Sequence, residues 1–396
     1  MTLRNLSHNR PSVTFNFKRA KKLDPRITFT RASFADNLGN PINEPSSGSA
    51  SQVGGSYNMF NINVPRLTDQ GLLIEESRSN LFINSTWNFQ NQQGTNIVIT
   101  QNSTDIAAPD GTFTSTHITA DSTNYLNNKF INGNALSNGK KITYSFWIYP
   151  KSIDVRLTPT PNAIRPRIGA GLSNGAGAVQ PIIPLEMNKW QRISLTTTQP
   201  NDGAGQIQPS LLRDQSNVDI YVWGLQIENG AFMTSFIPCN GAQTTRAKDI
   251  CTLHNIDSWG YSNRRGSFVV DADVIGSRNY STFIAGTNKF ANLEFHTFSE
   301  RKILWRWITG SEVESPALSG ITDPIKLSAT YAIGSKSVLA VNSTAYTTSG
   351  LATSTMANTK IYLFDSEQNQ ELNGYFSRLS YYPARLLDTA LQALTY

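Results

Sequence analysis

Two pairs of acidic residues are the first candidates for chemistry, because glycoside hydrolysis needs two carboxylates on either side of one bond. Glu75 and Glu76 are adjacent, and neighbouring residues of a strand point to opposite faces, so a structural role is favoured for this pair. Asp271 and Asp273 alternate with apolar residues and therefore share one strand face. Their spacing suits a carboxylate pair or a Ca²⁺ site, although a solvated strand face is the favoured interpretation.

Other catalytic signatures are missing from the sequence. The four histidines, at positions 8, 117, 254 and 296, are scattered, and no HExxH motif occurs. The chain has neither a GxSxG nucleophile elbow nor a P-loop. We therefore predict no catalytic residue, no metal site and no cofactor. Cys239 and Cys251 allow at most one disulfide bond, and the sequence does not decide whether they pair.

Aromatic side chains are candidates for binding sugars, whose C–H faces stack on exposed rings. Trp305 and Trp307 are two residues apart in a strand-like stretch and share one face. Trp259 and Tyr261 lie in a turn-rich segment. All four are candidate glycan-binding residues. A core or subunit-contact role is the favoured interpretation for the three tryptophans.

The composition favours a β-rich protein with neutral polar surfaces. Charged residues make up 16% of the 396 residues and apolar residues 39%, against about 25% and roughly 45–50% in typical globular proteins. The net charge of +6 includes one dense basic segment, at residues 18–22, which is too short to predict a nucleic-acid partner. No apolar stretch reaches the length of about 18 residues needed to span a membrane, and the first residues lack an apolar signal core. Membrane insertion and secretion by a signal peptide are therefore not expected.

Alternating apolar and polar residues predict the strands that would position these side chains. The pattern occurs at residues 13–17, 27–30, 141–149, 190–196, 218–227, 266–276, 360–364 and 374–381. Loops rich in Asn, Gly and Asp separate these stretches, which favours antiparallel sandwiches. Only the end of the chain is predicted to be helical, because Leu386, Leu387, Ala390, Leu391 and Leu394 recur on one helix face.

We predict an all-β fold with an extended N-terminal arm over residues 1–83 and a short C-terminal helix. Two antiparallel β-sandwiches of the jelly-roll type follow the arm, over residues 84–250 and 262–396, with a linker at residues 251–261. The arm contains a Gly/Ser/Pro-rich loop at residues 43–56, which cannot bury enough apolar area to fold alone. The arm is therefore expected to pack on another domain or on a partner.

The stretch YVWGLQIENGAFMTSFIP, at residues 221–238, is predicted to close the first sandwich. Alternation places Tyr221, Trp223, Leu225 and Ile227 on one strand face. Burial of the Trp223 side chain is worth a few kcal/mol, and Gly224 leaves room beside the indole. Asn229 and Gly230 can adopt a positive φ and end the strand.

The segment that leaves this strand carries two charged residues with a predicted structural role. Arg246 and Asp249 are three residues apart. We predict that they hold the exit segment to Glu75 or Glu76 through charge-assisted hydrogen bonds.

Several motifs resemble a known family. LDPRITFTRAS at residues 23–33, VPR at 64–66 and GLLIEESRSNLFINST at 71–86 resemble the N-terminal segment of bacteriophage tail-fibre, head-fibre and minor structural proteins. WGLQIENG at residues 223–230, together with FIP and TRAKD at residues 245–249, resembles the end of a carbohydrate-binding-module-like jelly roll in the same proteins. The family tends to have alanine at position 248 and threonine at position 239, where this chain has Lys248 and Cys239.

The C-terminal text NGYFSRLSYYPARLLDTALQAL, at residues 373–394, resembles the last strand and helix of a concanavalin-like (laminin-G-like) jelly roll. The predicted structural residues come from the shared motifs and the segments around them: Arg31, Glu75, Arg78, Trp223, Arg246 and Asp249. The resemblance implies a virion protein, usually a trimer.

The favoured function is a non-catalytic phage fibre or spike protein that attaches to the particle by its arm and binds host-surface glycans or receptors. The expected partners are two further copies in a homotrimer, other virion proteins of the tail, portal or capsid, and host polysaccharide. The expected location is the virion, assembled in the bacterial cytoplasm. One alternative is a polysaccharide depolymerase that uses Asp271 and Asp273. The other is a purely structural adaptor or decoration protein that binds no glycan.

Overall fold

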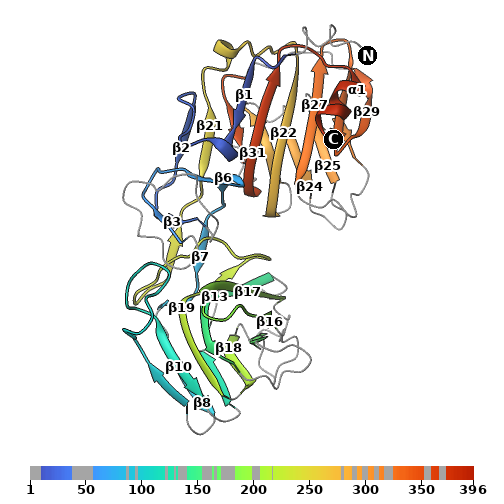
Figure 1. The fold of residues 1–396 in the computed structure, drawn as a ribbon. Coiled ribbons are helices and arrows are strands. Elements are labelled where there is room, and N and C mark those ends of the chain that lie inside the picture. The colour runs from blue at the N-terminus through green and yellow to red at the C-terminus, as the bar shows by residue number, and fades with distance from the viewer. Residues whose placement is uncertain are drawn as a thin grey trace.

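The structure is a computed structural model. It describes residues 10–37, 57–85, 89–93, 97–120, 124–128, 131–132, 141–153, 163–164, 167–170, 183–198, 206–215, 217–277, 281–287, 292–296, 302–306, 312–315, 324–351, 358–364 and 372–396. These residues form two β-sandwiches joined end to end by a narrow waist (Figure 1). The predicted all-β class with one short C-terminal α-helix is confirmed.

The second sandwich contains both ends of the described chain. One of its sheets has the strand order β29 (Thr344–Leu351), β28 (Lys336–Val341), β27 (Ile325–Ala332), β22 (Arg265–Ser277), β31 (Leu372–Tyr382), β6 (Gly71–Ile74) and β5 (Arg66–Thr68), with β1 (Val13–Asn16) also paired to β31. The facing sheet runs β2 (Ile27–Thr30), β21 (Ile250–Leu253), β30 (Ile361–Leu363), β23 (Ser281–Gly286), β24 (Asn292–His296), β25 (Lys302–Arg306) and β26 (Glu312–Glu314). A continuous apolar core lies between them.

The two sheets of the first sandwich come from the middle of the chain. One sheet has the order β17 (Gln191–Thr198), β13 (Lys141–Ser152), β19 (Val218–Asn229), β10 (Thr116–Ala120) and β9 (Ile97–Thr100). The other runs β12 (Ile131–Asn132), β18 (Gln206–Gln215), β11 (Asn124–Asn128) and β8 (Phe89–Gln93), with β15 (Arg167–Ala170) paired to β18. A small ladder joins β14 (Ala163–Ile164) and β16 (Ile183–Pro184).

The described part of the predicted arm is not a separate segment, because its strands complete the second sandwich. β1 pairs with β31, and β2 pairs with β21. Both strands alternate buried and exposed residues, and the short 3-10 helix η2 (Phe17–Arg19) that follows β1 buries Phe17 in the same core. The expectation that the arm packs on another domain is therefore met within the chain. The prediction of a separate arm over residues 1–83 is corrected.

The predicted linker over residues 251–261 is also corrected. It contains most of β21, which lies between β2 and β30 in the second sandwich. The 3-10 helix η3 (Ile256–Trp259) follows, and its Ile256 and Trp259 are buried. The strand pattern was missed because β21 is short and its last three residues are all buried, so the alternation that marks a half-exposed strand is lacking.

The waist between the sandwiches is crossed by two antiparallel strands that pair with each other. β7 (Arg78–Asn80) leads into the first sandwich and β20 (Thr244–Arg246) leads out of it. A second small ladder, β3 (Ala35–Asp36) with β4 (Met59–Phe60), lies beside them (Figure 1). The first sandwich is thus an insertion between β6 and β21 of the second.

The strand at residues 218–227 is present as β19, but the predicted side-chain faces are wrong beyond Trp223. Tyr221 and Trp223 lie in one aromatic cluster, whereas Leu225 and Ile227 lie in the apolar core on the other side. The pairing of β19 with β13 shifts register between Ser145 and Trp147, and Gly224 has a φ of +66°. A β-bulge at Gly224 therefore inverts the alternation.

The C-terminal helix α1 (Asp388–Leu394) confirms the helical prediction, with Leu391 fully buried. Leu386 and Leu391 pack on β22 and β28 through Val269, Val338 and Ala340. Leu387 departs from the predicted apolar face, because it precedes the first helical turn and is 66% exposed.

Substitution of Gly224 tests the bulge. A Cβ at this position would lie 3.1 Å from Cδ1 of Trp147. The substituted residue would also have to keep the left-handed φ of +66°. We expect Gly224→Ala to lower the free energy of unfolding by about 2–3 kcal/mol, from strain and crowding together. Urea denaturation followed by fluorescence measures this loss.

The matched control is Gly241→Ala. Gly241 also has a positive φ, of +84°, but a Cβ there would meet no atom within 4 Å. This variant should lose only the strain energy, about 1 kcal/mol. Equal losses in the two variants would contradict the close packing of Trp147 on Gly224.

Candidate functional site

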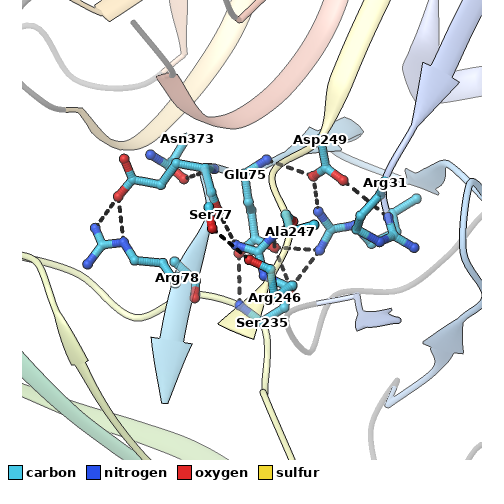
Figure 2. A network of polar contacts seen from close by, with 12 residues as sticks. Arg31, Glu75, Ser77, Arg78, Ser235, Arg246, Ala247, Asp249 and Asn373 are labelled. Atoms are coloured by element: carbon cyan, nitrogen blue, oxygen red, sulfur yellow. Dashed lines mark hydrogen bonds and ion pairs between the residues drawn. The ribbon is translucent and has the colours of Figure 1, made fainter. Parts of the chain in front are cut away.

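The waist contains a buried network of charged residues, which we call the junction network (Figure 2). Its arginines are Arg31, Arg66, Arg78 and Arg246, its acids are Asp36, Glu75, Glu76 and Asp249, and Ser235 lies among them; all are at most 7% exposed. They come from the arm, from β5, β7 and β20, and from the segments that follow β6, β19 and β20. Four positive and four negative side chains offset one another, as burial of charge requires.

Arg66 lies at the centre of the junction network. One terminal nitrogen, Nη1, donates to Oε2 of Glu75 at 2.5 Å and to the hydroxyl of Ser235 at 2.6 Å. The other, Nη2, pairs with Oδ2 of Asp249. Burial alone would lower the pKa of Arg66, but the carboxylates of Asp249 and Glu75 outweigh burial and raise that pKa. Arg66 therefore links β5 both to the point where the chain leaves the second sandwich, at Glu75, and to the point where it returns, at Asp249.

Glu75 and Asp249 are also joined through their backbones. The amide of Glu75 donates to Oδ2 of Asp249 at 2.8 Å, and the amide of Asp249 donates to the carbonyl oxygen of Glu75 at 2.9 Å. Arg246 lies 3.7 Å from Oε2 of Glu75 and donates to the carbonyl oxygen of Glu76 at 2.5 Å. The contacts predicted from the sequence between Arg246, Asp249 and Glu75 are thus present.

The ionised form of Glu75 is strongly favoured. Burial alone would raise the pKa of its carboxyl, but the guanidinium groups of Arg246 and Arg66 and the hydroxyl of Ser235 outweigh burial. Together they lower the pKa from 4.5 to about 2. A carboxyl that stays ionised at neutral pH and is bound to fixed donors cannot serve as a general acid.

Arg31 connects the arm to this centre. Its Nη1 donates to Oδ1 of Asp249 at 3.2 Å, and its Nε donates to the carbonyl oxygen of Ser33 at 2.8 Å. Its Nη2 donates to the carbonyl oxygens of Asn61 and Val64, at 2.9 and 3.2 Å. Burial, aided by repulsion from Arg66, lowers the pKa of Arg31 to about 10.

Arg78 explains why a glycine, Gly230, follows the end of β19. Its Nε donates to Oε1 of Glu76 at 2.5 Å, and its guanidinium stacks over the ring of Phe232 at 4.8 Å. A Cβ on Gly230 would lie 1.6 Å from Nη1 of Arg78, so no other residue fits there without moving the arginine. The backbone amide of Glu76 donates to Oδ1 of Asn373 at 2.7 Å, which ties this pair to β31.

The residues after Gly230 are held from both sides. The amide and hydroxyl of Thr234 donate to the buried carboxylate of Glu228, at 2.7 and 2.6 Å. The amide of Ser235 donates to Oε1 of Glu75 at 2.8 Å, and the amide of Phe236 donates to Oδ2 of Asp36 at 3.1 Å. This segment therefore supplies the donors that complete the junction network.

Trp223 has the predicted structural role, in a cluster that the sequence did not reveal. It is 7% exposed and packs against Phe236, with ring centroids 4.7 Å apart. Tyr57, from the arm, meets Trp223 edge-on at 5.3 Å and Trp147 at 6.1 Å. The arm thus contributes side chains to both sandwiches.

The aromatic residues predicted to bind glycans do not form a surface platform. Trp259, Tyr261 and Trp305 are buried in the core of the second sandwich, at 4%, 8% and 0% exposure, so their ring faces cannot stack on a sugar. The core interpretation favoured for Trp259 and Trp305 agrees with these positions. Trp307 lies outside the described residues.

The acidic pair Asp271 and Asp273 lies on β22. Asp271 is opposite Arg378 of β31 and forms an ion pair with it, at 2.9 Å. It is also opposite Lys326 of β27. The Asp271 carboxylate is therefore engaged in a cross-strand ion pair.

Within the part of the chain that the structure describes, no group of three or more His, Cys, Asp or Glu side chains could hold a metal ion. No helix in that part is long and apolar enough to cross a membrane. Cys239 and Cys251 are free thiols, and burial raises the pKa of both. The disulfide bond between Cys239 and Cys251, which the sequence left undecided, is therefore absent.

The sequence did not reveal the roles of Arg66, Asp36 and Ser235. Arg66 lies in the VPR motif, which carried the resemblance but no assigned role. Charge balance is the signal that would have found Arg66. Three buried arginines next to Glu75 and Asp249 are stable only if these arginines and acids neutralise one another. Asp36 accepts from Arg66 through its backbone carbonyl oxygen, and Ser235 acts through an uncharged hydroxyl, so neither leaves such a signal.

No protein-family model matches the chain, and no curated protein matches it. Solved structures that match include the CBM40 of the Ruminococcus gnavus IT-sialidase bound to α2,3-sialyllactose, with 12% identity, a TM-score of 0.28, and coverage of 33% of this chain and 82% of that one. A CBM4 structure matches with 20% identity, a TM-score of 0.25, and coverage of 37% and 99%. The sialidase of Trypanosoma rangeli matches with 10% identity, a TM-score of 0.30, and coverage of 73% and 52%. Similarity at this level transfers neither a fold nor an activity to this chain.

Removal of Arg246 tests the junction network. The Arg246→Ala variant leaves the carboxylate of Glu75 with fewer buried partners. We expect the free energy of unfolding to fall by about 3–5 kcal/mol, as when one partner of a buried ion pair is removed. Urea denaturation measures this change.

The control is Lys189→Ala, which removes an ion pair with Glu186 whose side chains are 68% and 70% exposed. Solvent screens such a pair, so stability should hardly change. A loss in Arg246→Ala as small as that in Lys189→Ala would show that the junction network does not contribute to stability.

The lowered pKa of Glu75 predicts a specific dependence of stability on pH. The Glu75 carboxylate stabilises the folded state above its unfolded pKa of about 4.5, and this contribution is lost as the pH falls towards 2. We expect Glu75→Gln to be less stable than the wild type at neutral pH, and to lose less stability over this acidic range. Thermal unfolding at a series of pH values measures both. A parallel pH dependence in the two proteins would contradict the assignment.

Proposed function

We propose that this chain is a non-catalytic bacteriophage fibre or spike protein that holds two β-sandwiches in a fixed orientation and adheres to host-surface glycans. The observation that carries the proposal is the convergence of the family-like motifs on the junction network. Arg31, Arg66, Glu75 and Arg78 come from the three N-terminal motifs, and all of them are buried at the waist. Residues of the motifs that resemble virion proteins are thus proposed to have an architectural role here.

The apolar contacts around the junction network support a rigid unit. Phe232, from the first sandwich, packs so closely on Gly276 of β22 that a Cβ there would lie 2.0 Å from its ring. Met233 packs against Leu73 and Tyr375, which belong to the second sandwich. Contacts of this kind limit rotation about the two crossing strands. Surface loops of both sandwiches are then presented at fixed positions.

Rigid presentation suits adhesion by many weak contacts. In a homotrimer, each binding site that engages raises the effective concentration of the others, so a weak glycan affinity becomes a strong attachment. The described arm strands are part of the second sandwich, and residues 1–9 lie outside the described residues. Attachment to the particle through the arm stays part of the proposal, as does assembly in the bacterial cytoplasm.

A non-catalytic role is supported by the ion pairs that the candidate acidic residues form. In the junction network, Glu75 and Asp249 are bound to arginines and have no access to solvent. The Asp271 carboxylate, needed by a depolymerase, is paired with Arg378. These acids are held as structural ion pairs.

The experiment is a binding and cleavage assay with polysaccharide from the surface of the host bacterium. The purified chain should be retained on immobilised polysaccharide, and no new reducing ends should appear. Light scattering on the same sample should give about three times the chain mass of 43.7 kDa.

The control is Asp271→Asn, which should change neither retention nor the reducing-end signal. Release of sugar by the wild type and its loss in Asp271→Asn would establish the depolymerase instead. Failure of the wild type to be retained on any host polysaccharide would favour the purely structural adaptor.

A further inference from the structure

An open groove lies on the first sandwich, beside the waist. We call it the Trp223 groove. It is lined by Ser85, Asp110, Thr114, Trp223, Phe236, Pro238, Cys239 and Asn240 and has a volume of about 330 Å³. Pro238 is exposed and supplies most of the apolar lining, beside the small accessible parts of Trp223 and Phe236, which are 7% and 4% exposed. The loop with Asp110 and Thr114, together with Ser85 and Asn240, supplies a carboxylate, hydroxyls and an amide.

A chain of hydrogen bonds connects the apolar and polar parts of the groove. The indole Nε1 of Trp223 donates to the hydroxyl of Thr114 at 3.0 Å, and that hydroxyl bonds to the hydroxyl of Thr112 at 2.6 Å. Thr112 in turn donates to Oδ1 of Asp110 at 2.7 Å. The amide of Thr112 also donates to Oδ1, at 3.0 Å. Both bonds of Asp110 that involve described residues fall on Oδ1, so Oδ2 is available to a ligand.

The apolar lining is fixed before any ligand arrives. Trp223 is held between Tyr57 and Phe236, with ring centroids 5.3 and 4.7 Å away. Phe236 is anchored by the hydrogen bond from its amide to Asp36. A binding site whose side chains are already ordered loses little conformational entropy on binding.

The mixture of groups indicates the class of ligand. A sugar ring presents apolar C–H groups and hydroxyls on the same small surface, and the groove offers apolar contacts beside hydroxyl, amide and carboxylate partners. A volume of about 330 Å³ is at the lower end of the ~300–1,000 Å³ typical of small-molecule sites, which suits one or two rings.

We propose that the Trp223 groove binds a neutral saccharide, with Asp110 accepting hydrogen bonds from its hydroxyls. This inference rests on the adhesive function proposed above and assigns it a site. Among the described residues of the lining, Asp110 is the one with a charge, and its negative charge repels sugar carboxylates. The groove therefore discriminates against acidic sugars such as uronic acids.

The experiment measures binding to a defined panel of sugars. The neutral members are glucose, galactose, N-acetylglucosamine, maltose and lactose, and the acidic member is glucuronic acid. Saturation-transfer difference NMR detects weak binding, and titration calorimetry gives the affinity. At least one neutral sugar should bind the wild-type chain, and glucuronic acid should bind more weakly than glucose.

The test variant is Asp110→Ala, which removes the charged acceptor. It should weaken binding of the neutral sugar about tenfold or more, because a hydrogen bond to a charged group is lost. The control is Asp105→Ala. Asp105 lies five residues earlier, its side chain is 60% exposed, and it accepts a hydrogen bond from Tyr221 outside the groove. This variant should bind as the wild type does.

Two outcomes would contradict the assignment of the Trp223 groove as a saccharide site and leave the proposed adhesive function unaffected. One is neutral-sugar binding that is equally strong in Asp110→Ala and the wild type. The other is a wild-type chain that is retained on host polysaccharide but binds no neutral sugar of the panel. Preference for glucuronic acid over glucose would overturn the assigned ligand class.

Discussion

The structure depends on one buried arginine that neutralises two acids from different parts of the chain. Arg66 of β5 binds Glu75, which follows β6, and Asp249, which precedes β21. These two acids mark the points where the chain leaves the second sandwich and returns to it. An unpaired charge at this depth would cost several kcal/mol, so the three segments are stable only when they are together. When these three segments come together, the second sandwich is therefore closed and the inserted first sandwich is placed at the same time.

The other contacts of the waist follow from this pairing. Arg31 shares Asp249 and so positions the arm, while Ser235 shares Glu75 and so positions the segment that leaves β19. Phe236, next to Ser235, reaches back to Trp223 and supports the groove on the first sandwich. The buried charges thus determine the geometry of a surface that we propose to bind sugar. This connection gives the junction network a functional consequence beyond stability.

Sequence patterns correctly predicted those features that depend on residues close together in the chain. The strands that became β13, β19, β22 and β31, and the helix α1, were predicted from periodicity, and the contacts of Arg246 and Asp249 with Glu75 from charge and motif. The arm was missed because β1 pairs with β31 more than 360 residues away, and periodicity does not report partners. The faces of β19 were wrong because one glycine bulge inverts alternation. Trp259 and Trp305 were glycan candidates because sequence does not show whether a ring is covered.

The central claim is that the junction network holds the two sandwiches as one rigid body. Spin labels on Lys189→Cys in the first sandwich and Lys336→Cys in the second, both exposed positions, allow the distance between them to be measured by double electron–electron resonance. The native thiols of Cys239 and Cys251 are buried, so the introduced cysteines react first. We predict a single narrow distance distribution that broadens when Arg66→Met is added. A broad distribution in the doubly labelled chain without Arg66→Met would contradict the claim.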